Sequence, residues 1–143
     1  QSPFLKSIIL NKGSKDKVLI GMAVLDDDYL VGKVVDVTYS TSRVLLLSDL
    51  NSKIPVDIMP ESLKSILSGT GEDNGIIQYL KNENIIETDS KVFTSGAGDI
   101  FRPGIPIGKI VKKPGSSILN VDFYSDFSQL RFVKLISFQK VEN

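Results

Sequence analysis

The sequence predicts an all-β protein built from small barrels. Apolar residues recur with a period of two in several segments, and β-branched residues are concentrated in short runs. Turn-forming residues separate these runs about every 8 to 12 residues, a spacing typical of sandwiches and barrels. The alternation therefore predicts half-buried strands as the main element of the fold.

The first clear strand is expected to start at Tyr29, where the odd-numbered positions are mostly apolar. Gly32, Asp36 and Thr38 lie between them, as expected for a strand with one solvated face. The odd-numbered apolar residues are Tyr29, Val31, Val35, Val37 and Tyr39, with Lys33 as the exception. β-branched runs in residues 34–47 and 131–138 predict further strands.

Two later segments, residues 53–59 and 118–127, also alternate. Their inward-facing residues are expected to be Ile54, Val56 and Ile58 in the first and Leu119, Val121 and Phe123 in the second. Residues 60–69 instead place Leu63, Ile66 and Leu67 at helical spacing. Serine and β-branched residues are poor helix formers, which weighs against a helix there.

Turns are expected where glycine, asparagine, aspartate and serine gather between the strands. The segments concerned are NKGSKDK, LDDDYL, YSTS, SDLNSK, GTGEDNG and KPGSS. Three consecutive aspartates in LDDDYL do not reproduce the alternating ligands and central glycine of a calcium loop. We therefore interpret this segment as a solvated hairpin turn.

The glycine-rich segment VFTSGAGDIFRPGIPIGKI, residues 92–110, is the most tempting candidate for chemistry. It fails the spacing of a P-loop and of a dinucleotide-binding fingerprint, and Phe93 occupies the first glycine position of a nucleophile elbow around Ser95. A structural role fits better. A strand ends at Ser95, Pro103 and Gly104 form a turn, and Pro106 confines the next strand to a sheet edge or a bulge.

Composition excludes several classes of function. The sequence has no histidine and no cysteine, so a Ser-His-Asp or Cys-His device and the usual structural zinc sites cannot form. Seventeen basic residues balance seventeen acidic ones, which argues against nucleic-acid binding. Lys12, Lys15, Lys17 and the pair Lys112 and Lys113 are interpreted as solvated turns. The sequence shows neither a membrane-spanning apolar stretch nor a signal peptide, and it starts without methionine. We therefore expect a fragment whose targeting or anchoring part lies upstream.

Three segments carry a resemblance to a known family. Residues 8–58, 65–80 and 88–110 resemble the periplasmic region of MreC, the rod-shape-determining proteins of bacteria, and together they extend the resemblance over essentially the whole chain. The residues that match the family motifs are Asn11, Gly13, Gly21, Gly32, Ser42, Asp49, Gly69, Gly71, Thr94, Ser95, Gly96, Gly98, Gly104, Pro106 and Gly108. The departures from the pattern are Lys17, Ser65, Thr88, Asp99 and Arg102.

The resemblance implies two small six-stranded β-barrels, loosely like the barrel pair of trypsin-like proteases but without a catalytic triad. The expected units are residues 1–59 and 60–143, with the alternative that the terminal strand returns to the first barrel. It also implies a non-enzymatic protein without catalytic, cofactor or metal sites. The full-length protein would be anchored by one helix on the periplasmic side of the bacterial inner membrane.

The partners implied by the resemblance are MreB, MreD, the elongation transpeptidase and its glycosyltransferase partner, together with homodimers or larger self-assemblies. Such a scaffold would bind and activate proteins of peptidoglycan synthesis. Two alternatives stay open: a protease-like hydrolase and a generic β-barrel ligand-binding domain. Candidate contact residues are the aromatics Tyr29, Phe101 and Tyr124 if they are exposed, and Asp99 and Arg102 as departures from the family pattern.

Overall fold

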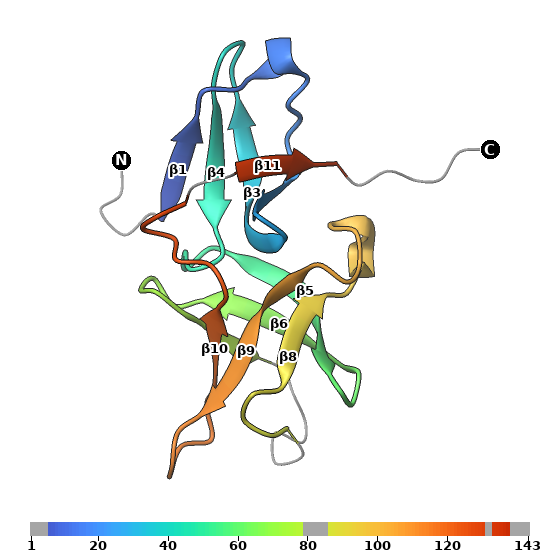
Figure 1. The fold of residues 1–143 in the computed structure, drawn as a ribbon, viewed down its shortest axis with the longest axis vertical. Helices are drawn as coiled ribbons and strands as arrows, with labels where there is room; N and C mark the ends of the chain where they lie inside the picture. Colours follow the sequence, from blue (N-terminus) through green and yellow to red (C-terminus); the bar gives the residue numbers. More distant parts are fainter. Residues whose placement is uncertain (1–5, 79–85, 131–132, 138–143) are drawn as a thin grey trace, which may run out of the picture.

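The computed structural model describes residues 6–78, 86–130 and 133–137, and these form an all-β fold with eleven strands. An open sheet and a closed barrel follow each other along the long axis of the molecule (Figure 1). Among the described residues, two connections contain single 3₁₀ turns, η1 (Ser14–Asp16) and η3 (Ala97–Asp99). The predicted all-β class is confirmed, whereas the predicted pair of barrels is confirmed for one unit alone.

The open sheet has five antiparallel strands in the described residues. They are β1 (Ser7–Leu10), β2 (Ala23–Asp26), β3 (Tyr29–Val37), β4 (Ser42–Leu46) and β11 (Val133–Ile136), in the order β1-β4-β3-β2-β11. A six-stranded barrel was expected here, and that expectation is wrong for the residues that the structure describes. Strands β1 and β11 do not pair with each other, so the sheet does not close.

The second unit is a closed six-stranded antiparallel barrel, as expected. Its strands are β5 (Lys53–Met59), β6 (Leu63–Gly69), β7 (Gly75–Gln78), β8 (Lys91–Thr94), β9 (Pro106–Lys112) and β10 (Leu119–Phe123), in the order β10-β7-β6-β5-β8-β9. The predicted inward faces of β5 and β10 are confirmed. Ile54, Val56, Ile58, Leu119 and Val121 are buried in the barrel core, and Phe123 packs against it.

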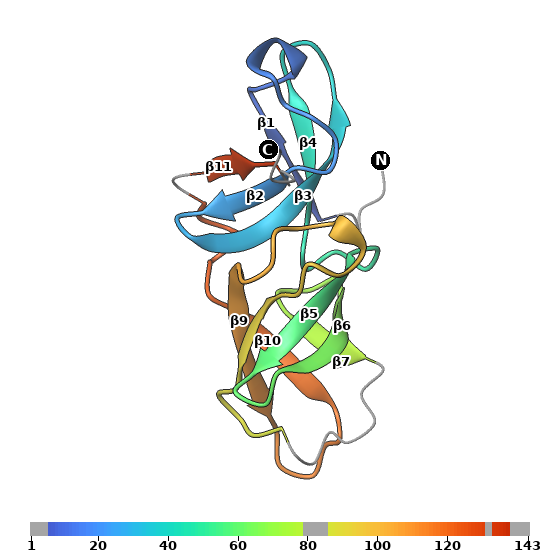
Figure 2. The ribbon, with the colours of Figure 1, turned by 90° about the vertical axis from the view of Figure 1, so that its right-hand side faces the viewer.

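Sheet membership changes between β4 and β5, and β11 returns to pair with β2 at the far end of the chain. The division into residues 1–59 and 60–143 stays a prediction, because strand pairing alone does not define domains. Figure 2 shows the β2–β3 hairpin lying directly over the barrel. Ala23, Leu25 and Leu30 from this hairpin belong to the same buried cluster as the barrel interior.

Strand β3 departs from the predicted pattern of one buried and one solvated face. Leu30, Val31 and Val34 are all fully buried. Leu30 packs with the barrel, whereas Val31 and Val34 pack in the core of the open sheet. The register also shifts between Val34 and Asp36, and Tyr39 is exposed beyond the strand. The prediction was wrong because β3 lies between two cores.

Residues 63–69 form strand β6, so the helical spacing there does not produce a helix. Each of the six predicted turn segments contains part or all of a connection between two strands, with η1 inside the first of them. Pro106 pairs with Phe93 next to a register shift between β8 and β9. The predicted bulge is therefore confirmed, but β9 is not an edge strand, because it pairs with both β8 and β10.

Candidate interaction surface

The glycine-rich connection between β8 and β9 is held in place by the buried side chain of Thr94. Its Oγ1 donates a hydrogen bond to the Arg102 carbonyl at 2.6 Å and accepts one from the Ile105 amide at 2.9 Å. The Thr94 amide also donates to the Ile105 carbonyl, and its own carbonyl accepts from the Gly104 amide, both at 2.9 Å. Such side-chain bonds satisfy backbone groups that a closed turn would otherwise leave unpaired.

The turn conformation itself requires glycine at particular points. Gly96 has φ 57° and Gly104 has φ 86°, both in the left-handed region that favours glycine. Ser95 is buried, and its Oγ accepts a hydrogen bond from the Ala97 amide at 3.2 Å. Ser95 therefore completes the turn, and the structural interpretation of this segment agrees with its geometry.

This connection forms one wall of a hollow between the barrel and the open sheet, which we call the junction cleft. Its volume is ≈ 300 Å³. The lining residues are Leu19, Ile20, Gly21, Met22, Lys33, Asp99, Ile100 and Ser137. Segments from β1–β2, β3, η3 and the end of β11 meet there, so the cleft exists only because the two units pack together.

Two consecutive aliphatic side chains make the junction cleft unusual. Leu19 is 62% exposed and Ile20 is 68% exposed, although both are large and apolar. They precede Gly21, whose φ of 98° turns the chain into β2. Single exposed apolar residues are common, but an adjacent pair beside a hollow is typical of a binding surface.

The polar rim of the junction cleft contains one charge of each sign. Asp99 is exposed and has φ 55°, while Lys33 from β3 is half-buried. Of the two departures from the family pattern that were named as contact candidates, Asp99 thus lies in the cleft. Arg102 is exposed but does not line it. The cleft therefore offers an apolar contact bordered by polar groups, as protein interfaces do.

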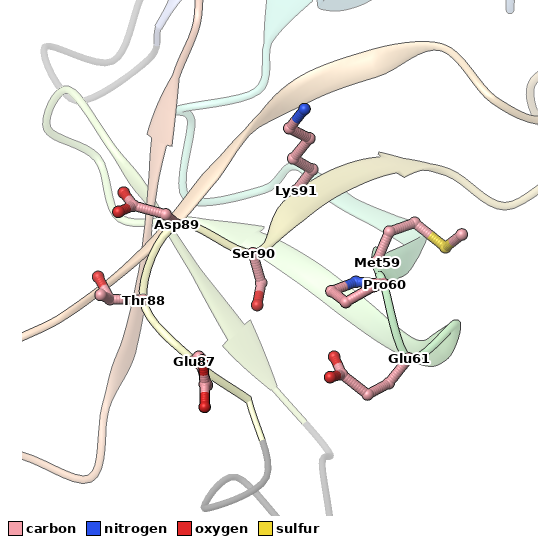
Figure 3. Close-up of a pocket in the computed structure, with 8 residues that line it drawn as sticks. All are labelled: Met59, Pro60, Glu61, Glu87, Thr88, Asp89, Ser90 and Lys91. Atoms are coloured by element: carbon pink, nitrogen blue, oxygen red, sulfur yellow. The ribbon is translucent and has the colours of Figure 1, made fainter.

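A second hollow of ≈ 350 Å³ lies at the barrel wall where β5 ends and β8 begins (Figure 3). It is lined by Met59, Pro60, Glu61 and residues 87–91. The Lys109 ammonium lies 3.5 Å from an Asp89 carboxylate oxygen, so one of its acidic groups is partly neutralised. Within the described ranges no group of three or more acidic side chains is arranged to hold a metal ion.

The three aromatic residues named as candidate contacts differ in exposure. Phe101 is buried in the barrel core and is not a surface contact. Tyr29 and Tyr124 are each 38% exposed and lie together, with ring centroids 5.0 Å apart. Burial raises the pKa of the Tyr124 hydroxyl, nearby Tyr29 adds to that effect, and Lys109 opposes it. These two tyrosines remain candidates for contact with a partner.

The predicted motif residues lie mainly at tight backbone positions. A Cβ on Gly13, Gly32, Gly69 or Gly108 would collide with a neighbouring backbone carbonyl, which explains their glycines sterically. Asp49 is buried between the two units, where its carboxylate accepts hydrogen bonds from the Lys6 amide at 2.6 Å and the Asn51 amide at 2.7 Å.

Of the other motif residues, Asn11 is exposed after β1 and Ser42 is buried in β4. Positive φ angles are found at Gly21, Gly71, Gly96, Gly98 and Gly104. The β8–β9 connection is shaped by Thr94, Ser95 and Pro106. Sequence reasoning did not select Leu19 and Ile20. Their signal was two adjacent apolar residues outside any period-two run and directly before a glycine.

Comparison with known proteins identifies the family. Residues 1–137 match the family described as rod shape-determining protein MreC, barrel core. The chain belongs to the MreC family. MreC proteins are non-enzymatic cell-shape proteins, so the hydrolase alternative is set aside.

Individual members agree with this assignment. The chain is 31% identical to the cell shape-determining protein MreC of Cereibacter sphaeroides over 99% of its own length and 47% of that protein. It superposes on the crystal structure of MreC from Pseudomonas aeruginosa with a TM-score of 0.85 and 31% identity, covering 95% of this chain and 91% of the other. The chain spans less than half the length of the curated MreC relatives compared with it, 47% and 40% for two of them.

Two further solved structures share the fold at lower identity. One is described as the major periplasmic domain from the cell shape-determining filament MreC, with a TM-score of 0.78, 22% identity and coverage of 96% and 90%. The other is a complex between penicillin-binding protein PBP2 and MreC from Helicobacter pylori, with a TM-score of 0.66, 17% identity and coverage of 82% and 78%. Within the described residues no helix is long and apolar enough to cross a membrane.

Proposed function

We propose that this chain is the periplasmic scaffold region of a cell-shape protein, which binds and activates the proteins that elongate the peptidoglycan wall. The observation that carries the proposal is that an MreC protein of the same fold forms a complex with PBP2. The partner of this chain would be the corresponding elongation transpeptidase. Activation would follow from preferential binding to the active conformation of that enzyme, because a ligand shifts an equilibrium only by its differential affinity.

The junction cleft is the surface that suits this role best. Leu19 and Ile20 offer adjacent exposed aliphatic side chains, and Ile100 extends the apolar contact from the barrel side. Asp99 and Lys33 on the rim can fix the orientation of a partner through charge complementarity. Because the cleft combines both units, a partner bound there would also hold their relative orientation.

The wider set of partners follows from the family. MreB, MreD and the glycosyltransferase partner of the transpeptidase would be linked through the full-length protein, which would be anchored by one membrane helix upstream of this chain. Self-assembly would involve the open sheet, since β1 and β11 each have one unpaired edge among the described residues and Ile9 on β1 is exposed.

The proposal is tested by crosslinking this chain to the periplasmic region of the elongation transpeptidase. Ile20→Asp would place a charge in the junction cleft and is expected to weaken the complex at least tenfold, or by about 1.4 kcal/mol. Ile118→Asp is the matched control, since Ile118 is also exposed but lies in the β9–β10 turn at the far end of the barrel.

Equal loss of binding in the two variants would reject the junction cleft as the contact surface. The absence of any complex with the unmodified, folded chain would reject direct activation of the transpeptidase by this region.

A further inference from the structure

The end of the open sheet farthest from the barrel has a local excess of positive charge. Lys12, Lys15 and Lys17 are all exposed and lie in or beside the 3₁₀ turn η1, in a chain whose formal net charge is zero. Asp16 is the acidic residue of the same turn, and its carboxylate accepts a hydrogen bond from the Gly13 amide at 3.0 Å. Figures 1 and 2 show this turn, in blue, at one extreme of the long axis.

The turn is held against the β3–β4 hairpin, so the lysines are presented on a fixed support. The Ser14 amide donates to the Thr38 carbonyl at 2.8 Å, and the Lys15 amide donates to the Tyr39 carbonyl at 3.0 Å. Gly13 is buried in this contact, and a Cβ there would collide with the hairpin backbone. Little ordering entropy therefore needs to be lost when this surface meets a ligand.

Tyr39 adds an amphipathic ring to the charged surface. It is 72% exposed, and the Lys15 ammonium lies 5.9 Å from the centre of its ring. Exposed tyrosine next to lysine is typical of residues at a membrane interface, where the ring enters the headgroup layer and the ammonium meets phosphate.

Lys17 supplies an independent observation. Its backbone has φ 67° and ψ 27°, a left-handed conformation that costs conformational free energy for any residue other than glycine or asparagine. Glycine would therefore stabilise the fold at this position, so that Lys17→Gly removes the charge without destabilising the turn.

We propose that this surface, which we call the basic tip (Lys12, Lys15, Lys17 and Tyr39), docks on the anionic headgroups of a membrane. The positive charges are all lysines, which act as point charges, whereas recognition of individual carboxylates in a protein favours the planar fork of arginine. The three exposed lysines lie in one short segment at an extreme of the molecule, and each lysine near an anionic surface contributes about fivefold in binding. The attraction between the lysines and the headgroups is modest, so it matters most for a domain that is already held near a membrane.

The first test uses sedimentation of the chain with vesicles of phosphatidylcholine, with or without phosphatidylglycerol. Binding is expected only to the anionic vesicles and is expected to weaken as salt rises from about 0.05 M to about 0.5 M. The combined variant Lys12→Gln, Lys15→Gln, Lys17→Gly is expected to bind about a hundredfold more weakly. Lys64→Gln, Lys109→Gln, Lys113→Gln is the control of equal charge, made on the barrel, and is expected to retain binding.

Two further measurements separate charge from folding and locate the contact. Lys17→Gly alone is expected to raise the melting temperature by about 2–4 °C while weakening vesicle binding about fivefold. The chain contains no tryptophan, so Tyr39→Trp introduces a single reporter whose emission is expected to shift to the blue on anionic vesicles. Ile118→Trp, at the opposite end of the molecule, is expected to show no shift.

The proposal is overturned if the unmodified chain ignores anionic vesicles at low salt, or if the barrel control loses as much binding as the basic tip variant. Tighter binding of polyglutamate than of anionic vesicles to the basic tip would identify an acidic protein as the partner instead. None of these assays contains the transpeptidase, so their outcome is independent of the proposed complex.

Discussion

The closed barrel and the open sheet differ in whether their strands leave unpaired edges. Every barrel strand pairs on both sides, whereas β1 and β11 of the sheet each pair on one side among the described residues. Ala23, Leu25 and Leu30 from the sheet nevertheless belong to the same buried cluster as the barrel core. The closed barrel therefore supports the fold. The candidate contact surfaces, which are the exposed edges, the junction cleft and the basic tip, all lie on the open sheet or at its border.

The largest effect is expected from removing a side chain that joins the two units. Leu30 is fully buried in the barrel cluster, and Leu30→Ala is expected to lower the free energy of unfolding by about 4 kcal/mol. Val31→Ala, in the sheet core, is the neighbouring comparison and is expected to cost about 2 kcal/mol. Urea unfolding measures both. If Leu30→Ala left the unfolding of the barrel unchanged, the two units would not share a core.

Alanine substitutions at two glycines test how easily the backbone of each unit can deform. A Cβ on Gly108 of β9 would collide with the Asp122 carbonyl, and one on Gly32 of β3 would collide with the Leu45 carbonyl. A closed barrel cannot widen locally without straining every strand, whereas an open sheet can splay at its free edge. Gly108→Ala is therefore expected to cost about 3 kcal/mol and Gly32→Ala about 2 kcal/mol. Thermal unfolding of the two variants checks the order, and the reverse order would contradict the proposed difference in compliance.

The smallest effect concerns Tyr124, which lies where barrel and sheet meet through its contact with Tyr29. The pKa of Tyr124 is raised in the folded chain, chiefly by burial. In the unfolded chain the hydroxyl ionises at a lower pH than in the folded chain. The contribution of the neutral Tyr124 hydroxyl to the free energy of unfolding is therefore present below about pH 10 and is lost as pH rises through the pKa of the folded chain.

Unfolding midpoints between about pH 9 and 11 should fall less steeply in Tyr124→Phe than in the unmodified chain. Identical slopes for Tyr124→Phe and the unmodified chain would contradict a raised pKa at this contact.

Local sequence information was sufficient for the strands and turns that face a single core. Alternation placed Ile54, Val56 and Ile58 inward because each strand of the barrel separates one core from solvent. Turn residues marked the connections because left-handed backbone positions, such as that of Gly104, favour glycine whatever the tertiary context. The absence of histidine and cysteine likewise limited the possible chemistry without reference to a structure.

Only the tertiary structure decided the features that depend on two segments meeting. Strand β3 is buried on both faces because the barrel covers Leu30 while the sheet covers Val31, and no pattern within one strand distinguishes that arrangement. The junction cleft combines residues 19–22 with Asp99 and Ile100, which lie far apart in the chain. Whether the sheet closes also depends on long-range pairing: among the described residues β11 pairs with β2 but not with β1, and the period of the strands does not predict this.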